Sequence, residues 1–167
     1  RLVETASPEA HQSRRVGVGP RRAATPLNVY FDTSALVKLI FDEPGSDFAE
    51  ELWERAALRI SGQLAYPELR AAIAAAHRAD RIDARQLRAA VRAADEIHEA
   101  LTTIALDESL AKAAGELAQR RGLRGYDAVH LASALAIDRT ETVLATWDRA
   151  LADAAVLEGL AVAPGTG

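Results

Sequence analysis

A regular alternation of short β-prone runs with helix-like segments is the feature that most constrains how this chain can fold. Apolar runs rich in strand-forming residues predict strands over 27–31, 58–61, 102–106, 141–146 and 160–162. Between these runs, helical spacing of apolar residues predicts helices over 33–40, 46–53, 67–79, 83–101, 107–122, 126–137 and 149–157. The alternation favours an α/β fold with a central, mostly parallel sheet of four to five strands flanked by helices.

Residues with known start and stop preferences bound several of the predicted helices. Ser46 follows a Pro-Gly break and is expected to cap the second helix, and Asp83 is expected to cap a long helix that ends near residue 101. Asp107 has the same role after the third strand, and Gly122 is expected to end the helix that follows.

Composition and charge divide the chain into a short basic segment and one domain. Residues 1–26 hold five arginines and two glutamates and read as a flexible basic extension that need not be native, since the chain lacks methionine. The domain is expected over residues 27–167, a length typical of a single domain. The absence of cysteine excludes disulfides and thiolate metal sites and fits the cytoplasm, and no apolar run approaches the roughly 20 residues of a membrane span.

The charge of the domain is unusual for a protein that binds nucleic acid. Residues 27–167 hold 15 basic and 22 acidic side chains, a net charge of −7, whereas nucleic-acid binders are ordinarily basic. Any affinity for phosphate must therefore come from a local feature, and bound divalent cations would supply one.

Four acidic residues are placed where an α/β fold would gather them. Asp32 follows the first predicted strand and Asp148 follows the fourth, so both would lie at the carboxyl edge of a parallel sheet, where such folds bind ligands. Glu68 and Asp127 stand near the starts of helices that face the same edge. Clustered carboxylates repel one another unless a cation joins them, and Mg²⁺ or Mn²⁺ prefers oxygen ligands.

Each of these acids also has a purely structural interpretation. Asp32, Asp127 and Asp148 could be helix caps, and Glu68 could be a first-turn acid that interacts with the helix dipole. The positions alone leave both interpretations open. Ser34 stands where aspartyl phosphohydrolases usually place a second aspartate, which disfavours that covalent chemistry.

Four segments of the sequence resemble the motifs of PIN-domain nucleases, over roughly residues 28–163. The segments are VYFDTSALVK at 29–38, YPELRA at 66–71, GLRGYDAVHLASA at 122–134 and VLATWD at 143–148. Within that superfamily the chain is most similar to the VapC toxins of bacterial toxin–antitoxin pairs. It departs from them at Gly62-Gln63, where relatives usually carry a hydroxyl or small residue.

The resemblance implies an Mg²⁺- or Mn²⁺-dependent endoribonuclease with a cytoplasmic RNA substrate. It assigns metal-ligand roles to Asp32, Glu68, Asp127 and Asp148, and a supporting hydroxyl to Thr146. Ser34 could orient a carboxylate or simply be a first-turn serine of its helix. A cognate antitoxin, whose arginine could reach the carboxylates, and a homodimer formed through the helices at 67–79 and 83–101 are the implied protein partners. Housekeeping RNA processing and a non-catalytic interaction module remain the alternatives.

Several other residues have competing interpretations. His130, three residues after Asp127, is expected to pack or to support the site through hydrogen bonds instead of acting as a ligand. Lys38 and Arg70 could steer RNA phosphates or simply be solvated. The two tryptophans, Trp53 and Trp147, are expected in the core or an interface instead of stacking on bases.

Overall fold

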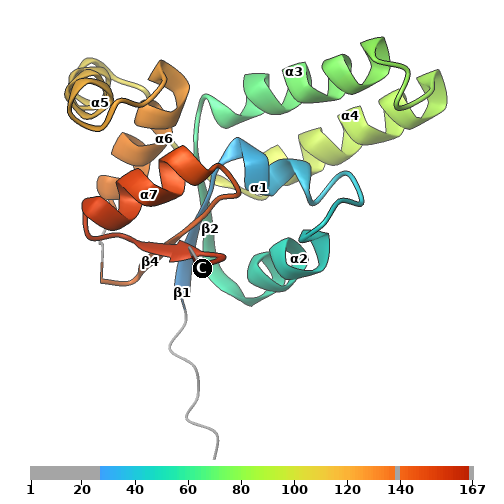
Figure 1. The fold of residues 1–167 in the computed structure, drawn as a ribbon. Helices are drawn as coiled ribbons and strands as arrows, with labels where there is room; N and C mark the ends of the chain where they lie inside the picture. The colour runs from blue at the N-terminus through green and yellow to red at the C-terminus, as the bar shows by residue number, and fades with distance from the viewer. Residues whose placement is uncertain (1–26, 138–139, 166–167) are drawn as a thin grey trace, which may run out of the picture.

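A five-stranded parallel sheet forms the centre of the molecule in the computed structural model, which describes residues 27–137 and 140–165 (Figure 1). The strand order is β3-β2-β1-β4-β5, and every described pairing is parallel. The strands are β1 (Leu27–Phe31), β2 (Ala56–Gly62), β3 (Thr102–Ile104), β4 (Thr142–Ala145) and β5 (Ala161–Ala163). The predicted α/β class is therefore confirmed, and β1, the most protected strand, lies in the middle of the sheet.

Helices cover both faces of the sheet, as a parallel sheet requires. The helices are α1 (Thr33–Val37), α2 (Ser46–Arg55), α3 (Ala65–Arg78), α4 (Ala84–Glu99), α5 (Glu108–Arg121), α6 (Gly125–Leu135) and α7 (Arg149–Leu157). Side chains alternate along β1, so Tyr30 joins a core with α5, α6 and α7, whereas Val29 and Phe31 join a core with α1, α3 and α4. Figure 1 shows these two groups of helices on opposite sides of the central strands.

Most predicted boundaries agree with the structure to within a few residues. β1 and α7 have the predicted bounds, Asp83 and Asp107 are N-caps of α4 and α5, and Gly122 ends α5 with a φ of 67°. The prediction that Ser46 caps α2 is wrong. Gly45 holds the cap position, and the Ser46 hydroxyl instead donates to the Phe41 carbonyl and accepts from the Glu43 amide. Ser46 therefore closes the preceding turn.

The α3–α4 hairpin projects from the sheet as an arm (Figure 1). Its two helices pack against each other and the body through small and branched side chains, among them Leu69, Ile73 and Ala94. Their apolar faces are thus used within the chain, and the homodimer remains a prediction. The basic extension predicted for 1–26 lies outside the described residues, and among residues 27–137 and 140–165 no helix has the length and apolarity to cross a bilayer.

Candidate active site

Asp32 is buried at the carboxyl end of β1 and is surrounded by hydrogen-bond donors. The residue is only 4% exposed. One carboxylate oxygen accepts from the Ala35 amide at 2.9 Å and the Ser34 hydroxyl at 2.7 Å, and the other accepts from the Thr146 hydroxyl at 2.7 Å. Asp32 is therefore the N-cap of α1, as the structural interpretation predicted, and it is also fixed from a second strand.

The surroundings of Asp32 leave its negative charge poorly compensated. Burial removes the carboxylate from water and raises its pKa, even though Thr146, Ser34 and Ala35 donate to it and the His130 side chain lies near. Neutral donors lower the cost of the charge, but none of them brings a full positive charge into contact. A cation bound beside Asp32 would remove this cost.

Thr146 connects Asp32 to Asp148. Its hydroxyl donates to Asp32 and accepts from the Asp148 amide at 3.0 Å, while the Ser34 hydroxyl accepts from the Trp147 amide at 2.8 Å. These bonds tie the end of β4 to the start of α1. Ser34 and Thr146 thus orient a carboxylate, and Asp148 also caps α7 by accepting from the Leu151 amide at 3.0 Å.

Glu68, in the first turn of α3, is held by two side chains. The Thr33 hydroxyl donates to its Oε2 at 2.5 Å, and Nε2–H of His130 donates to the same oxygen at 2.8 Å. On the other side of the His130 ring, Nδ1 lies 3.0 Å from the hydroxyl of the fully buried Tyr30. The supporting role expected for His130 is confirmed, because its ring is hydrogen-bonded both to Tyr30 of β1 and to the Glu68 carboxylate.

These contacts decide the charge state of Glu68. Its partial burial is the largest influence and acts to raise the pKa, but the hydrogen bonds from His130 and Thr33 and the positive charge of Arg124 outweigh it and lower the pKa. Glu68 is therefore ionised at neutral pH and available as an anionic ligand.

Arg124 joins the remaining two acids, and the sequence interpretation had overlooked it. Its Nε donates to Asp127 Oδ2 at 2.7 Å, and one terminal nitrogen donates to Asp148 Oδ2 at 2.9 Å. The guanidinium side chain is 73% exposed and reaches the pair from solvent. Asp127 sits at the third residue of α6 instead of at the cap, which the backbone of Arg124 occupies. The spacing of three residues between Arg124 and Asp127 was the available signal.

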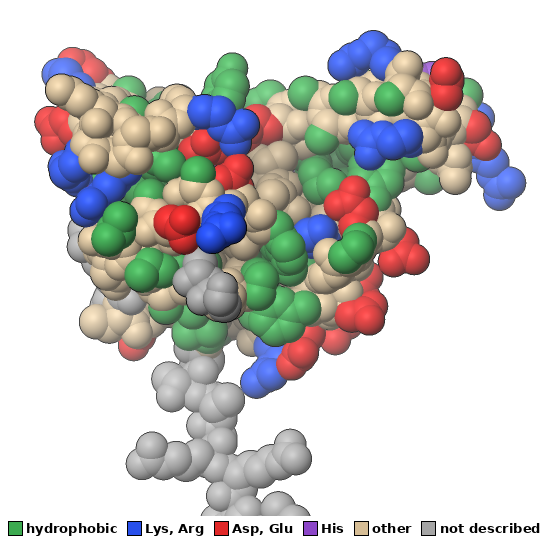
Figure 2. Space-filling model, in the orientation of Figure 1, with side chains coloured by type: hydrophobic (Ala, Val, Ile, Leu, Met, Phe, Trp, Pro, Cys, Tyr) green, Lys and Arg blue, Asp and Glu red, His purple; other side chains and the backbone are tan. Residues whose placement is uncertain are grey.

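The four acids belong to one network at the carboxyl ends of β1 and β4. The Thr146 hydroxyl is hydrogen-bonded to the Asp32 carboxylate and to the Asp148 amide. Arg124 contacts the carboxylates of both Asp148 and Asp127. Glu68 accepts from the hydroxyl of Thr33, the residue that follows Asp32. Figure 2 shows acidic side chains gathered between α7 and the α3–α4 hairpin. Among the described residues no three acids or histidines are close enough, as they stand, to enclose a metal ion. Arg124 now provides the positive charge between two of them.

The donor set nevertheless suits a hard divalent cation. All four predicted ligands offer carboxylate oxygen, which Mg²⁺ and Mn²⁺ prefer, and the buried Asp32 lacks a contacting cation. In the part of the chain that the structure describes, the guanidinium at the pair of Asp127 and Asp148 is that of Arg124, which is exposed and can move away without disturbing the core. The residues present therefore fit such an ion.

The glycine at the departure from the family pattern has a steric explanation. A Cβ at Gly62 would lie 2.9 Å from the Tyr30 hydroxyl, closer than real Cβ atoms approach. Gly62 thus leaves room for the hydroxyl that supports His130. Gln63 points elsewhere and accepts from the Leu106 amide through Oε1 at 3.3 Å.

The steering interpretation of Lys38 does not agree with the structure, whereas that of Arg70 stays a prediction. Lys38 is 8% exposed and donates to the Pro44 carbonyl at 2.8 Å, so it supports the α1–α2 turn and does not steer phosphate. Arg70 donates to the Tyr66 hydroxyl at 2.6 Å and to Asp95 at 3.3 Å. Both tryptophans pack within the fold, Trp53 against Phe31 and Trp147 against Phe48, as expected.

Comparison with known proteins identifies the family. The PIN domain model matches residues 29–157, and the chain belongs to the PIN-domain family. The matched stretch spans all four acids and the sheet edge that carries them.

Two curated relatives and two solved structures extend this comparison. The ribonucleases VapC45 and VapC49, from two strains of Mycobacterium tuberculosis, are each 45% identical over 136 residues, covering 81% of this chain and 94% of theirs. PAE2754 from Pyrobaculum aerophilum has the same fold, with a TM-score of 0.62, 21% identity and coverage of 81% and 83%. VapBC2 from Rickettsia felis, bound to a promoter DNA fragment, matches with a TM-score of 0.56, 15% identity and coverage of 81% and 97%.

Proposed function

We propose that this protein is a divalent-metal-dependent endoribonuclease and the toxin of a bacterial toxin–antitoxin pair. The observation that carries the proposal is the single network that joins Asp32, Glu68, Asp127 and Asp148 at one sheet edge. The similarity to VapC ribonucleases over most of both chains supports RNA as the substrate. Cleavage would then occur at a phosphodiester presented to this edge.

The four carboxylates are the proposed ligands of Mg²⁺ or Mn²⁺. When bound, such an ion stabilises charge on the phosphodiester and lowers the pKa of an attacking water. The protein's own contribution is orientation: Ser34 and Thr146 fix Asp32, while Thr33 and His130 fix Glu68. Arg124 must release the carboxylate oxygens that the ion requires.

Substitution of the acids tests this function. Asp32→Asn and Asp127→Asn should each abolish Mn²⁺-dependent cleavage of RNA and weaken Mn²⁺ binding in a calorimetric titration. Asp107→Asn is the matched control, because Asp107 is an exposed cap after β3 that accepts from the Leu110 amide and an asparagine would also cap. Undiminished cleavage by either site variant would refute the proposal that these carboxylates form the catalytic metal site. The absence of Mn²⁺ binding by the wild type would favour the interaction module.

The antitoxin partner is part of the same proposal. A solved structure with a similar fold is a toxin–antitoxin complex from Klebsiella pneumoniae, with a TM-score of 0.50, 21% identity and coverage of 72% and 87%. In this chain an exposed guanidinium already spans Asp127 and Asp148, so an arginine supplied by a partner could bind the same pair once Arg124 leaves. Co-expression with the product of the neighbouring gene should yield a complex in which RNA cleavage is suppressed.

The proposed homodimer and cytoplasmic location complete the functional model. Sedimentation of the purified protein over a range of concentrations should show a dimer. A neighbouring gene that encodes no small antitoxin-like protein would instead favour housekeeping processing of RNA.

A further inference from the structure

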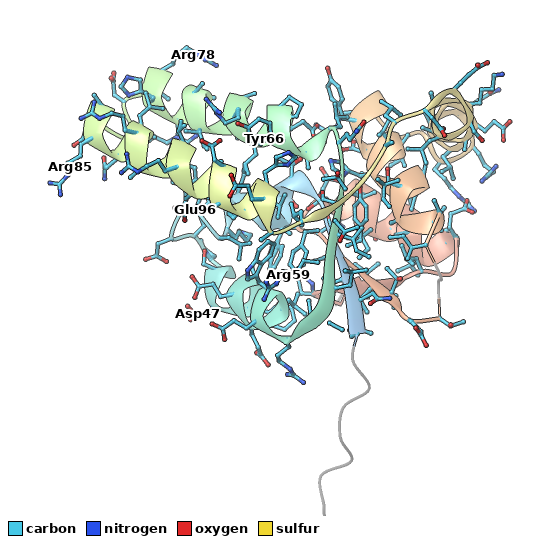
Figure 3. The ribbon with its side chains drawn as sticks, turned by 180° about the vertical axis from the view of Figure 1, so that it is seen from behind. Asp47, Arg59, Tyr66, Arg78, Arg85 and Glu96 are labelled. Carbon is cyan, nitrogen blue, oxygen red and sulfur yellow. The ribbon has the colours of Figure 1, made fainter. Side chains whose placement is uncertain are left out.

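The outer part of the α3–α4 arm has a charge opposite to that of the rest of the domain. Residues 70–92, called the arginine arm below, contain six arginines, two aspartates, and no lysine or glutamate, a net charge of +4. The remaining residues of 27–167 carry a net charge of −11. Figures 2 and 3 show basic side chains along this hairpin, with Arg78 and Arg85 at its outer end.

In the described part of the chain, the arginines of the arm differ from the other basic residues in having no ion pair, with the exception of Arg70, which contacts Asp95. Within residues 27–137 and 140–165, every Lys or Arg outside the arm contacts a carboxylate, except Arg59, which stacks on Trp53. Within the same ranges, five exposed arginines of the arm have no ion pair: Arg78, Arg81, Arg85, Arg88 and Arg92. In the same ranges Asp83 forms no ion pair with any of them, and its carboxylate accepts from the Gln86 amide at 2.7 Å.

The unpaired guanidinium groups are arranged along one side of a helix. Arg85, Arg88 and Arg92 are separated by three and four residues, so they lie on one face of α4 over about 10 Å. Arg88 and Arg92 border a groove of about 480 Å³ whose floor is apolar and whose far side includes Arg70. Repeated, planar, permanently charged groups match a repeating phosphate backbone better than a single anion.

The arm also starts at the candidate active site. Glu68 lies in the first turn of α3, two residues before the arm begins, and α3 continues outward from it for about 15 Å. A strand whose reacting phosphodiester lies beside Glu68 can therefore continue along the arm.

We propose that the arginine arm binds the phosphate backbone of single-stranded RNA that extends from the cleavage site. The proposal rests on the proposed ribonuclease function for the position of the cleavage site, but RNA binding to the arm can be measured without cleavage. Pairing of two arms about a two-fold axis would bring their unpaired arginines together, so like-charge repulsion favours RNA over an arm-to-arm contact with a second copy of this chain. The arm supplies affinity for RNA, and the carboxylates supply the chemistry.

The test compares two triple variants that lose the same charge. Arg85→Gln, Arg88→Gln and Arg92→Gln remove the proposed contacts from exposed helix positions, where glutamine is a good helix former. The control combines Arg55→Gln, Lys112→Gln and Arg149→Gln, which remove exposed basic side chains that are already paired with Glu51, Glu108 and Asp153. Circular dichroism confirms that both variants are folded.

Binding is measured by fluorescence anisotropy with a labelled, single-stranded RNA of about 20 nucleotides in EDTA, which prevents metal-dependent cleavage. The arm variant should bind about tenfold or more weakly at low salt, and its plot of log affinity against log KCl should be shallower by about 2, as expected for three lost contacts to a single strand. The control variant should match the wild type. An RNA of about four nucleotides, too short to follow the arm, should be cleaved equally by all three proteins in Mn²⁺.

Other outcomes overturn the proposal in distinguishable ways. Equal losses in both triple variants would mean that net charge alone attracts RNA. Unchanged RNA affinity together with lost binding of a poly-glutamate peptide would assign the arm to an acidic protein, and a dimer that dissociates only in the arm variant would make it an interface between copies. If the arm variant binds RNA more weakly but none of the three proteins cleaves RNA, the proposed ribonuclease function fails, while RNA binding by the arm stays supported.

Discussion

Replacement of Thr146 by valine tests whether the network of hydroxyls stabilises the site. Valine has nearly the same shape as threonine, so the change removes the hydroxyl from a residue that is 2% exposed. Two bonds disappear together: the donation to Asp32 at 2.7 Å and the acceptance from the Asp148 amide at 3.0 Å. Both partners remain in the protein, and each is left with one fewer hydrogen bond.

The expected loss follows from these two bonds. A hydrogen bond to a charged group contributes about 1.5–3 kcal/mol, and a buried amide left without a partner costs about 1–3 kcal/mol. The added methyl group offsets a fraction of this, so we expect Thr146→Val to lower the free energy of unfolding by about 2–4 kcal/mol. With a urea m value of about 1–3 kcal/mol per M, the midpoint of unfolding in EDTA should fall by about 1–2 M.

Thr146→Ser is the control, because serine keeps the hydroxyl and loses only a methyl group. It should cost about 1 kcal/mol. The interpretation requires valine to be at least 1 kcal/mol worse than serine, and Mn²⁺ binding to weaken in the valine variant alone. A valine variant that unfolds at the same urea concentration as the serine variant would show that the hydroxyl does not organise the site.

Three further predictions concern the other parts of the site and the core. Arg124→Gln should tighten Mn²⁺ binding in calorimetry several-fold, because the guanidinium no longer competes for carboxylate oxygens; weaker binding would contradict the competition. Burial raises the pKa of Asp32. The side chain is protonated and uncharged at low pH, and its ionisation lowers the stability of the protein as the pH rises from about 3.9 toward the raised pKa. Asp32→Asn should therefore gain stability over the wild type across that rise in urea unfolding with EDTA, and a pH-independent difference would exclude this cause. Leu131→Ala, in the fully buried centre of α6, should lose about 2–5 kcal/mol, whereas Leu157→Ala, 65% exposed, should change stability by less than about 0.5 kcal/mol.

Local signals were sufficient to predict the architecture. β1 is a run of five residues bounded by Asp32, and α7 is preceded by Asp148, whose side chain caps it. Such elements are specified by propensity, periodicity and caps that lie within a few residues of one another. The cap of α2 was misassigned because a serine next to a glycine offers two cap positions, and hydrogen bonds within the preceding turn, from Ser46 to Phe41 and from Glu43 to Ser46, decided between them.

The site could be predicted as a set of acids but not as a network. Position after a strand identified Asp32 and Asp148, and the cap interpretation proved correct for both without excluding a role in the site. The contact between His130 and Glu68 joins residues 62 positions apart, and that between Tyr30 and His130 joins residues 100 apart. No local pattern specifies such pairs, because they depend on which helix lies beside which strand end.

The charge distribution gains meaning only when the fold is known. In the sequence the domain is acidic, which first argued against nucleic acid as a ligand. The structure places most of the paired basic side chains of the described residues on an acidic body, where ion pairs at the surface contribute little, and five unpaired arginines on one hairpin. Arg124 belongs to the first group and contacts two of the acids of the site, Asp127 and Asp148. Because its side chain is exposed, Arg124 can leave these carboxylates and be replaced by a metal ion in the proposed active enzyme, or by an arginine of the antitoxin in the proposed inhibited complex.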